Sequence, residues 1–211
     1  MRAAEAECPR CLIWTSRQTD FIPTKSNRRR RETSLCWLCS LIWKLFLSGV
    51  SVQPLLHEAC ESLSIILGEW RGSGRGHYPT IDDFEYTEEV IFGHSGKPFL
   101  AYGQKTKNAV NGDPLHSEQG FLRATGETAL ELVVAQPSGI VEIHQGSFAS
   151  NESACVINLE SIYVETSPTA KSVERVHRLL RIEGDTLTYD LSMAAMGQPL
   201  QHHLAATLER Q

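Results

Sequence analysis

From about residue 63 to the C-terminus, apolar and polar positions alternate in short runs that are separated by turn residues. Residues 84–92 read FEYTEEVIF and residues 130–135 read LELVVA. Alternation with a period of two places apolar side chains on one face of a strand, and aromatic and β-branched residues favour strands. The expected strands span residues 84–92, 99–106, 118–124, 130–135, 140–146, 156–164, 173–182, 186–193 and 202–208.

The turns between these runs indicate how the strands connect. Sequences such as HSGKP at residues 94–98 and QPSG at 136–139 recur at the spacing of about 8–12 residues that is typical of sandwiches and barrels. Only residues 53–67 have a helical pattern, as a short lead-in before the first strand. Sequential hairpins without helical crossovers predict an all-β protein, an antiparallel up-and-down β-barrel whose lumen has room for one ligand.

A G-x-W-x-G-x-G motif, formed by Gly68, Trp70, Gly72 and Gly74, opens this region. Glycine at every second position removes the Cβ atoms where a strand bends sharply or where another backbone or a ligand comes close. The tryptophan is large enough to plug one end of a hydrophobic interior. We therefore expect the sheet to curl around its interior at this point.

Composition and charge narrow the function classes. The chain has 211 residues and a formal net charge of −5, which argues against a general nucleic-acid binder. Of the six cysteines, only Cys60 and Cys155 lie in the strand-rich body. That density is below that of a disulfide scaffold and predicts a reducing, cytoplasmic compartment.

Residues 1–53 differ from the body in composition. Two CxxC pairs, at residues 8–11 and 36–39, have a spacing that can hold zinc, but neither is followed by a knuckle glycine, and a chance occurrence is the simpler interpretation. The apolar run 35–52 is interrupted by Lys44 and is shorter than the about 20 residues of a membrane span. We expect an unstructured or atypical extension, without a membrane span.

Several segments of the body, in order, resemble the nitrobindins, which are haem-binding β-barrel proteins also described as peroxynitrite isomerases. They are GEWRGSG at residues 68–74, YPT at 78–80, FEYTE at 84–88, HSEQGFLR at 116–123 and MAAMGQPLQHHL at 193–204. The resemblance covers roughly residues 54–211. One branch of the family carries a THAP zinc domain, but Cys36 is followed by Cys39 here, not by the Cys-x-x-His of that domain.

The resemblance implies a calycin-like barrel of about ten strands that binds one ferric haem b per subunit. The family pattern P-[LM]-x-x-H-L selects His203 as the axial ligand of the haem iron, and the threonine of the Tyr-Pro-Thr segment, Thr80, would lie near the haem. The implied reaction converts peroxynitrite to nitrate, with reversible binding of nitric oxide. The sequence leaves the oligomeric state open between a monomer and a homodimer.

Alternation alone favours a different histidine. His202 shares its strand face with Leu200, Leu204 and Leu208, so the apolar face would bring His202 inward, whereas only the family motif selects His203.

Other residues carry two interpretations each. His116 and His144 could approach the lumen or pack within strands, and Met193 and Met196 could ligate iron or fill the core. Arg123 and Arg178 could pair with haem propionates or form cross-strand ion pairs. The rival to haem chemistry is a non-enzymatic carrier of a fatty-acid-like apolar ligand in the lumen.

Overall fold

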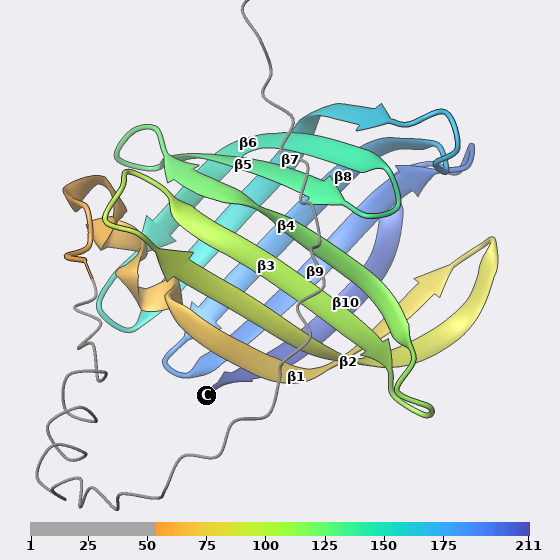
Figure 1. Cartoon of the computed structure of the whole chain (residues 1–211), viewed down its shortest axis with the longest axis horizontal. Helices are drawn as coiled ribbons and strands as arrows, with labels where there is room; N and C mark the ends of the chain where they lie inside the picture. The colour runs from red at the N-terminus through yellow and green to blue at the C-terminus, as the bar shows by residue number, and fades with distance from the viewer. Residues whose placement is uncertain (1–53) are drawn as a thin grey trace, which may run out of the picture. The chain divides into compact units, whose positions relative to one another are not determined.

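In residues 54–211, which the computed structural model describes, ten antiparallel strands close into a barrel because β1 pairs with both β2 and β10 (Figure 1). They are β1 (Gly68–Tyr78), β2 (Ile81–His94), β3 (Leu100–Asn108), β4 (Pro114–Ala124), β5 (Ala129–Gln136), β6 (Ile140–Ser150), β7 (Ala154–Thr166), β8 (Val173–Glu183), β9 (Thr186–Ala195) and β10 (Gln201–Arg210). Within this range no helix is long and apolar enough to cross a membrane.

The up-and-down barrel predicted from the sequence is confirmed, since every strand pairs with its neighbours in sequence. The lead-in before β1 is a 3-10 helix, η1 (Glu58–Ile66). Strands β2 and β4 begin three and four residues earlier than the alternation indicated, because their first residues, IDD at 81–83 and PLHS at 114–117, do not alternate between apolar and polar side chains. The CxxC pairs at 8–11 and 36–39 and the apolar run 35–52 lie outside the described residues.

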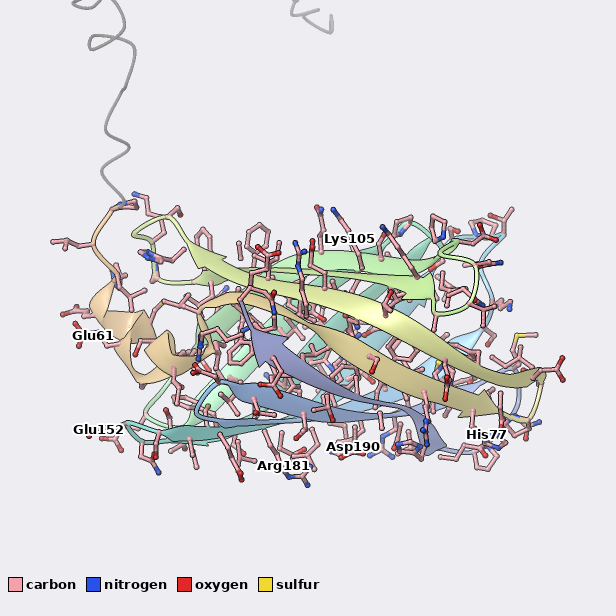
Figure 2. The ribbon with its side chains drawn as sticks, turned by 90° about the horizontal axis from the view of Figure 1, so that it is seen from below. Glu61, His77, Lys105, Glu152, Arg181 and Asp190 are labelled. Carbon is pink, nitrogen blue, oxygen red and sulfur yellow. The ribbon has the colours of Figure 1, made fainter. Side chains whose placement is uncertain are left out.

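Helix η1 and Trp70 close one end of the barrel. Leu63 and Ile66 of η1 are buried, and the indole Nε1 of Trp70 donates a hydrogen bond to the Ile66 carbonyl oxygen at 3.0 Å. The Arg210 guanidinium lies 4.0 Å from the centroid of the Trp70 ring and donates to the Ile65 carbonyl oxygen at 2.8 Å. In Figure 2, Glu61 of η1 and His77 of β1 lie at opposite ends of the barrel.

The glycines of β1 are needed where other groups approach the strand. A Cβ on Gly72 would lie 2.0 Å from the Thr207 carbonyl oxygen of β10, and one on Gly74 would lie 2.4 Å from Cζ of Tyr86. Gly68 has a φ of +125°, which L side chains rarely adopt. The motif therefore lets the first and last strands come together and lets an aromatic ring of β2 lie across β1.

The interior changes character along the barrel axis. Next to η1 it is apolar, and the mid-section holds charged and hydroxyl groups. The buried apolar side chains at the η1 end include Trp70, Leu100, Leu122, Leu130, Ile157, Ile182, Leu187 and Leu208.

Candidate functional site

A cavity of about 500 Å³ lies in the barrel at the end opposite η1. That volume falls in the range of about 300–1,000 Å³ found for small-molecule and cofactor sites. It reaches from the first residues of β2, β4, β6 and β8 inward to the buried polar groups of the mid-section. The apolar part of its wall is formed by Ile81, Phe84, Leu115, Ile140, Val173, Val176, Leu191, Met193 and Leu204.

His203 of β10 lines this cavity. Its Nδ1 lies 3.0 Å from the His77 carbonyl oxygen, and its ring meets the Tyr78 ring edge-on at 5.1 Å between centroids. A carbonyl oxygen can only accept, so Nδ1 carries the proton and the lone pair of Nε2 is left for a ligand. Burial lowers the pKa of His203 and so favours the neutral imidazole that binds metals.

A β-bulge explains why alternation pointed to the neighbouring residue. In the β9–β10 pairing, His202 lies opposite Ser192 and Leu204 opposite Leu191, so His203 is the extra residue. His203 and Leu204 therefore both line the cavity. The His202 side chain is 54 % exposed on the outside, 3.5 Å from Asp190.

Thr80 is placed at the rim. It belongs to the two-residue turn between β1 and β2, and it is exposed. The next residue, Ile81, lines the cavity, whereas Thr80 is not among the residues of its wall.

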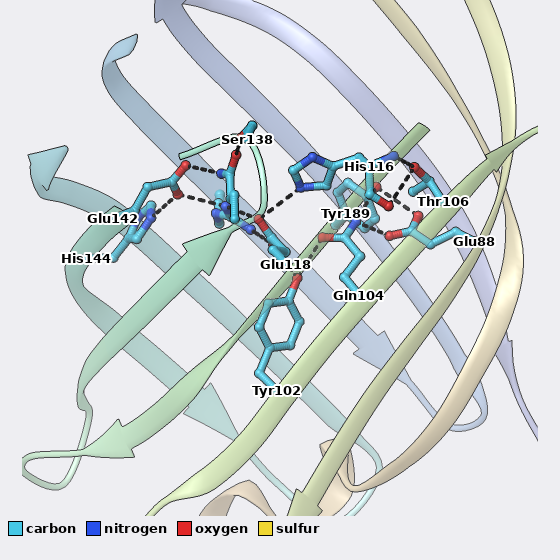
Figure 3. A network of polar contacts seen from close by, with 12 residues as sticks. Glu88, Tyr102, Gln104, Thr106, His116, Glu118, Ser138, Glu142, His144 and Tyr189 are labelled. Atoms are coloured by element: carbon cyan, nitrogen blue, oxygen red, sulfur yellow. Dashed lines mark hydrogen bonds and ion pairs between the residues drawn. The ribbon is translucent and has the colours of Figure 1, made fainter. Parts of the chain in front are cut away.

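The inner end of the cavity is a set of buried ion pairs centred on Arg178, whose partners Glu118 and Glu142 are labelled in Figure 3. The Arg178 guanidinium donates to both oxygens of Glu118 and, at 2.7 Å, to Glu142. His144 Nε2 lies 2.8 Å from Glu142. Burial alone would raise the pKa of both carboxyls, but Arg178 outweighs it and lowers them below the usual range, so both are ionised at neutral pH.

A third buried carboxyl, Glu88, has a different environment. Its partners are neutral: the Tyr189 hydroxyl donates to Oε2 at 2.8 Å, and the Gln104 amide donates to Oε1. Tyr189 is in turn 2.8 Å from the hydroxyl of Tyr86. Burial raises the pKa of Glu88 to about 7, and the hydrogen bonds from Tyr189 and Gln104 offset only part of that effect.

The structure distinguishes the paired interpretations left open by the sequence. Arg178 forms buried cross-strand ion pairs, and Arg123 lies on the outer surface, 3.6 Å from Glu131 on the next strand. His116 lines the cavity and His144 is fully buried in the ion-pair cluster. Met193 belongs to the cavity wall, whereas Met196 is exposed in the β9–β10 turn.

Three buried carboxylates, Glu88, Glu118 and Glu142, were not among the residues that the sequence pattern indicated. A local signal existed for Glu88, which is in phase with the inward-facing Tyr86 and Val90 along β2. Glu118 and Glu142 are likewise in phase with inward apolar residues of their strands. A glutamate at an inward position of a β-barrel strand therefore indicates a buried polar cluster, since carboxylates are rarely buried without partners.

Residues 59–210 match the family described as THAP4-like, heme-binding beta-barrel domain. The chain is 51 % identical over 156 residues to a Mycobacterium avium (strain 104) protein named peroxynitrite isomerase 2, covering 74 % of this chain and 97 % of that protein. A Nocardia farcinica (strain IFM 10152) protein named peroxynitrite isomerase is 46 % identical over 155 residues, 74 % of this chain and 92 % of its own length.

Among solved structures, the crystal structure of Rv2717c from M. tuberculosis superposes with a TM-score of 0.72 at 48 % identity, over 74 % of this chain and 99 % of that one. Family, sequence relatives and solved structure thus agree over the whole barrel. The chain belongs to the family of THAP4-like, heme-binding beta-barrel domains, which confirms its resemblance to the nitrobindins.

Proposed function

We propose that this chain is a haem-dependent peroxynitrite isomerase: it binds one ferric haem b per subunit, converts peroxynitrite to nitrate and binds nitric oxide reversibly. The observation that carries the proposal is the bulged His203, which lines the cavity and whose Nδ1 is engaged by the His77 carbonyl oxygen, so that Nε2 is left for a ligand. The relatives named peroxynitrite isomerase support the same reaction.

The residues of the cavity fit a haem. Imidazole is a common axial ligand of haem iron, and the hydrogen bond from Nδ1 to the His77 carbonyl fixes the ring and raises its basicity. The apolar wall suits a porphyrin face, and Lys171 at the cavity supplies a cation for a propionate. Bound ferric haem would supply the iron at which peroxynitrite rearranges.

The chain's own contribution is to hold and shield that group. His203 would bind the haem iron, Thr80 would lie near the bound haem, and the apolar wall would exclude water from the site. The buried thiols of Cys60 and Cys155, which are not paired with each other, fit the reducing compartment expected for a cytoplasmic protein.

A carrier of a fatty-acid-like ligand fits the cavity less well. Such a ligand brings a carboxylate, and the buried guanidinium at the inner end, Arg178, is already held by Glu118 and Glu142. The ligand would add a third carboxylate there, which would face the charges of Glu118 and Glu142 without a cation of its own.

The test is a hemin titration of the full chain that follows the Soret band, with His203→Ala and the matched control His202→Ala, one residue away on the outer surface. We expect saturable one-to-one binding in wild type and His202→Ala, and its loss in His203→Ala. Peroxynitrite decay at neutral pH then tests the reaction, and equal rates for wild type and His203→Ala would reject an iron-centred role. A colourless protein that copurifies with lipid would instead support the carrier.

A further inference from the structure

Three hydroxyl and carboxyl groups form a continuous line from the barrel interior to the cavity wall. Glu88 Oε2 lies 2.8 Å from the Tyr189 hydroxyl oxygen, which lies 2.8 Å from the Tyr86 hydroxyl oxygen. Tyr86 lines the cavity. Figure 3 shows Glu88, Tyr189 and Gln104 directed toward one another from β2, β9 and β3.

Glu88 is distinguished from the other interior carboxyls by its neutral partners. Glu118 and Glu142 share Arg178, whereas among the residues that the structure describes no cation pairs with Glu88. The titratable and polar groups around Glu88 are Tyr189 of β9, Arg178 of β8, Gln104 and Tyr102 of β3, Glu118 and His116 of β4 and, on its own strand, Tyr86; Arg178 lines the same small interior space, but its guanidinium pairs with Glu118 and Glu142. Burial raises the pKa of Glu88 to about 7, because the hydrogen bonds from Tyr189 and Gln104 offset only part of its effect, so both protonation states are accessible near neutral pH.

The protonation state of Glu88 determines which way the hydrogen bonds of the line run. When Glu88 is ionised it can only accept, so Tyr189 donates to Glu88 and Tyr86 donates to Tyr189. The Tyr86 oxygen then offers only lone pairs to the cavity. When Glu88 is protonated it can donate to Tyr189, and Tyr189 can donate to Tyr86. The Tyr86 hydroxyl hydrogen is then no longer used by Tyr189 and can be donated to an acceptor in the cavity that Tyr86 lines.

We infer that Glu88, Tyr189 and Tyr86 form a proton-carrying chain, through which a buried carboxyl supplies a proton to a ligand with a basic oxygen, such as a small oxyanion, bound against Tyr86. Tyr86 is the residue that contacts the ligand. Tyr189 relays the proton, and Glu88 stores it.

The transfer balances without any added reactant. The ligand oxygen takes the Tyr86 hydroxyl proton, Tyr86 takes that of Tyr189, and Tyr189 takes that of Glu88. The ligand gains one proton, both tyrosines end neutral, and Glu88 becomes a carboxylate. Reversal of the same steps from a protonated ligand or a cavity water restores the carboxyl.

The experiment is a pH titration of the full chain labelled with ¹³C at the tyrosine ζ carbon and observed by NMR without added haem. Five tyrosines give five resonances, assigned by single Tyr→Phe substitutions. We expect the Tyr189 and Tyr86 resonances to shift with one common midpoint near pH 7, although Tyr86 is not bonded to Glu88. The exposed Tyr163 serves as the reference.

Two variants separate a chain from isolated contacts. In Glu88→Gln both steps should disappear. In Tyr189→Phe, which also removes the Tyr189 resonance, the Tyr86 step should disappear because its connection to Glu88 is broken. Glu165→Gln, which removes an exposed glutamate of β7, should leave both steps in place. A Tyr86 resonance that does not move with that of Tyr189, or a step that persists in Glu88→Gln, would overturn the inference. Because no haem is present, the result is independent of the hemin titration.

Discussion

Glu88→Gln is the substitution that most directly tests the electrostatics of the interior, because glutamine has the shape of a protonated carboxyl and cannot ionise. In wild type, burial raises the pKa of Glu88 from 4.5 to about 7, so the folded protein binds this proton more tightly than the unfolded chain. The stability contributed by this proton is therefore fully present below about pH 4.5 and is lost as the pH rises through 7.

The size of the effect follows from the two pKa values. The difference between 4.5 and about 7 corresponds to roughly 3 kcal/mol in the free energy of unfolding, of which about 2 to 3 kcal/mol falls between pH 5 and pH 8. Glu118 and Glu142 have lowered pKa values, so their contribution has the opposite sign and is lost on acidification. It is present in both proteins and largely cancels in the comparison.

The assay is chemical denaturation followed by far-ultraviolet circular dichroism at pH 5 and pH 8. Relative to wild type, Glu88→Gln should gain about 2 to 3 kcal/mol in unfolding free energy between the two pH values. The exposed Glu165→Gln should show no such gain. A Glu88→Gln difference that is the same at both pH values would refute the assignment of a neutral-range proton to this carboxyl.

Two further substitutions test the packing of the barrel. Gly72→Ala should lower the free energy of unfolding by at least about 2 kcal/mol in chemical denaturation, because the new Cβ would lie 2.0 Å from the Thr207 carbonyl oxygen. Gly103→Ala, which has open space at its Cβ, should change that free energy little. Equal effects of the two substitutions would contradict the close approach at Gly72. Arg178→Met should lower the free energy of unfolding by about 3–5 kcal/mol at pH 7, because it leaves two buried carboxylates without their cation. Arg123→Met, which removes an exposed ion pair, should lower it by less than about 1 kcal/mol. Similar losses in both variants would show that the interior pairs are screened like surface pairs.

The barrel could be predicted from the sequence because its signals are local. Alternation, turn residues and the absence of a helical period are each contained within about ten residues, and an up-and-down order pairs neighbours in sequence. The orientation of His203 could not be predicted in this way. It depends on which residue of β10 is left unpaired against β9, and alternation assumes that none is.

The partners of the interior charges were also beyond the sequence. The position of Glu88 in phase with Tyr86 is visible along β2, but Tyr189, which holds it, is 101 residues away in the chain. Arg178 is separated from Glu118 by 60 residues and offered two equally reasonable roles. Which of them applies depends on strand register around the closed barrel, and no single stretch of sequence contains that information.

The charge at the inner end of the cavity also bears on which ligands it admits. Glu118 and Glu142 are ionised and share the single charge of Arg178, which leaves one negative charge, and ionised Glu88 would make it two. Burial lowers the pKa of His144, so that imidazole adds no positive charge. An anion is therefore repelled from this end of the cavity, whereas a neutral diatomic molecule is not. An oxyanion that accepts the proton of Glu88 through Tyr86 becomes neutral at the point where its charge would be most unfavourable.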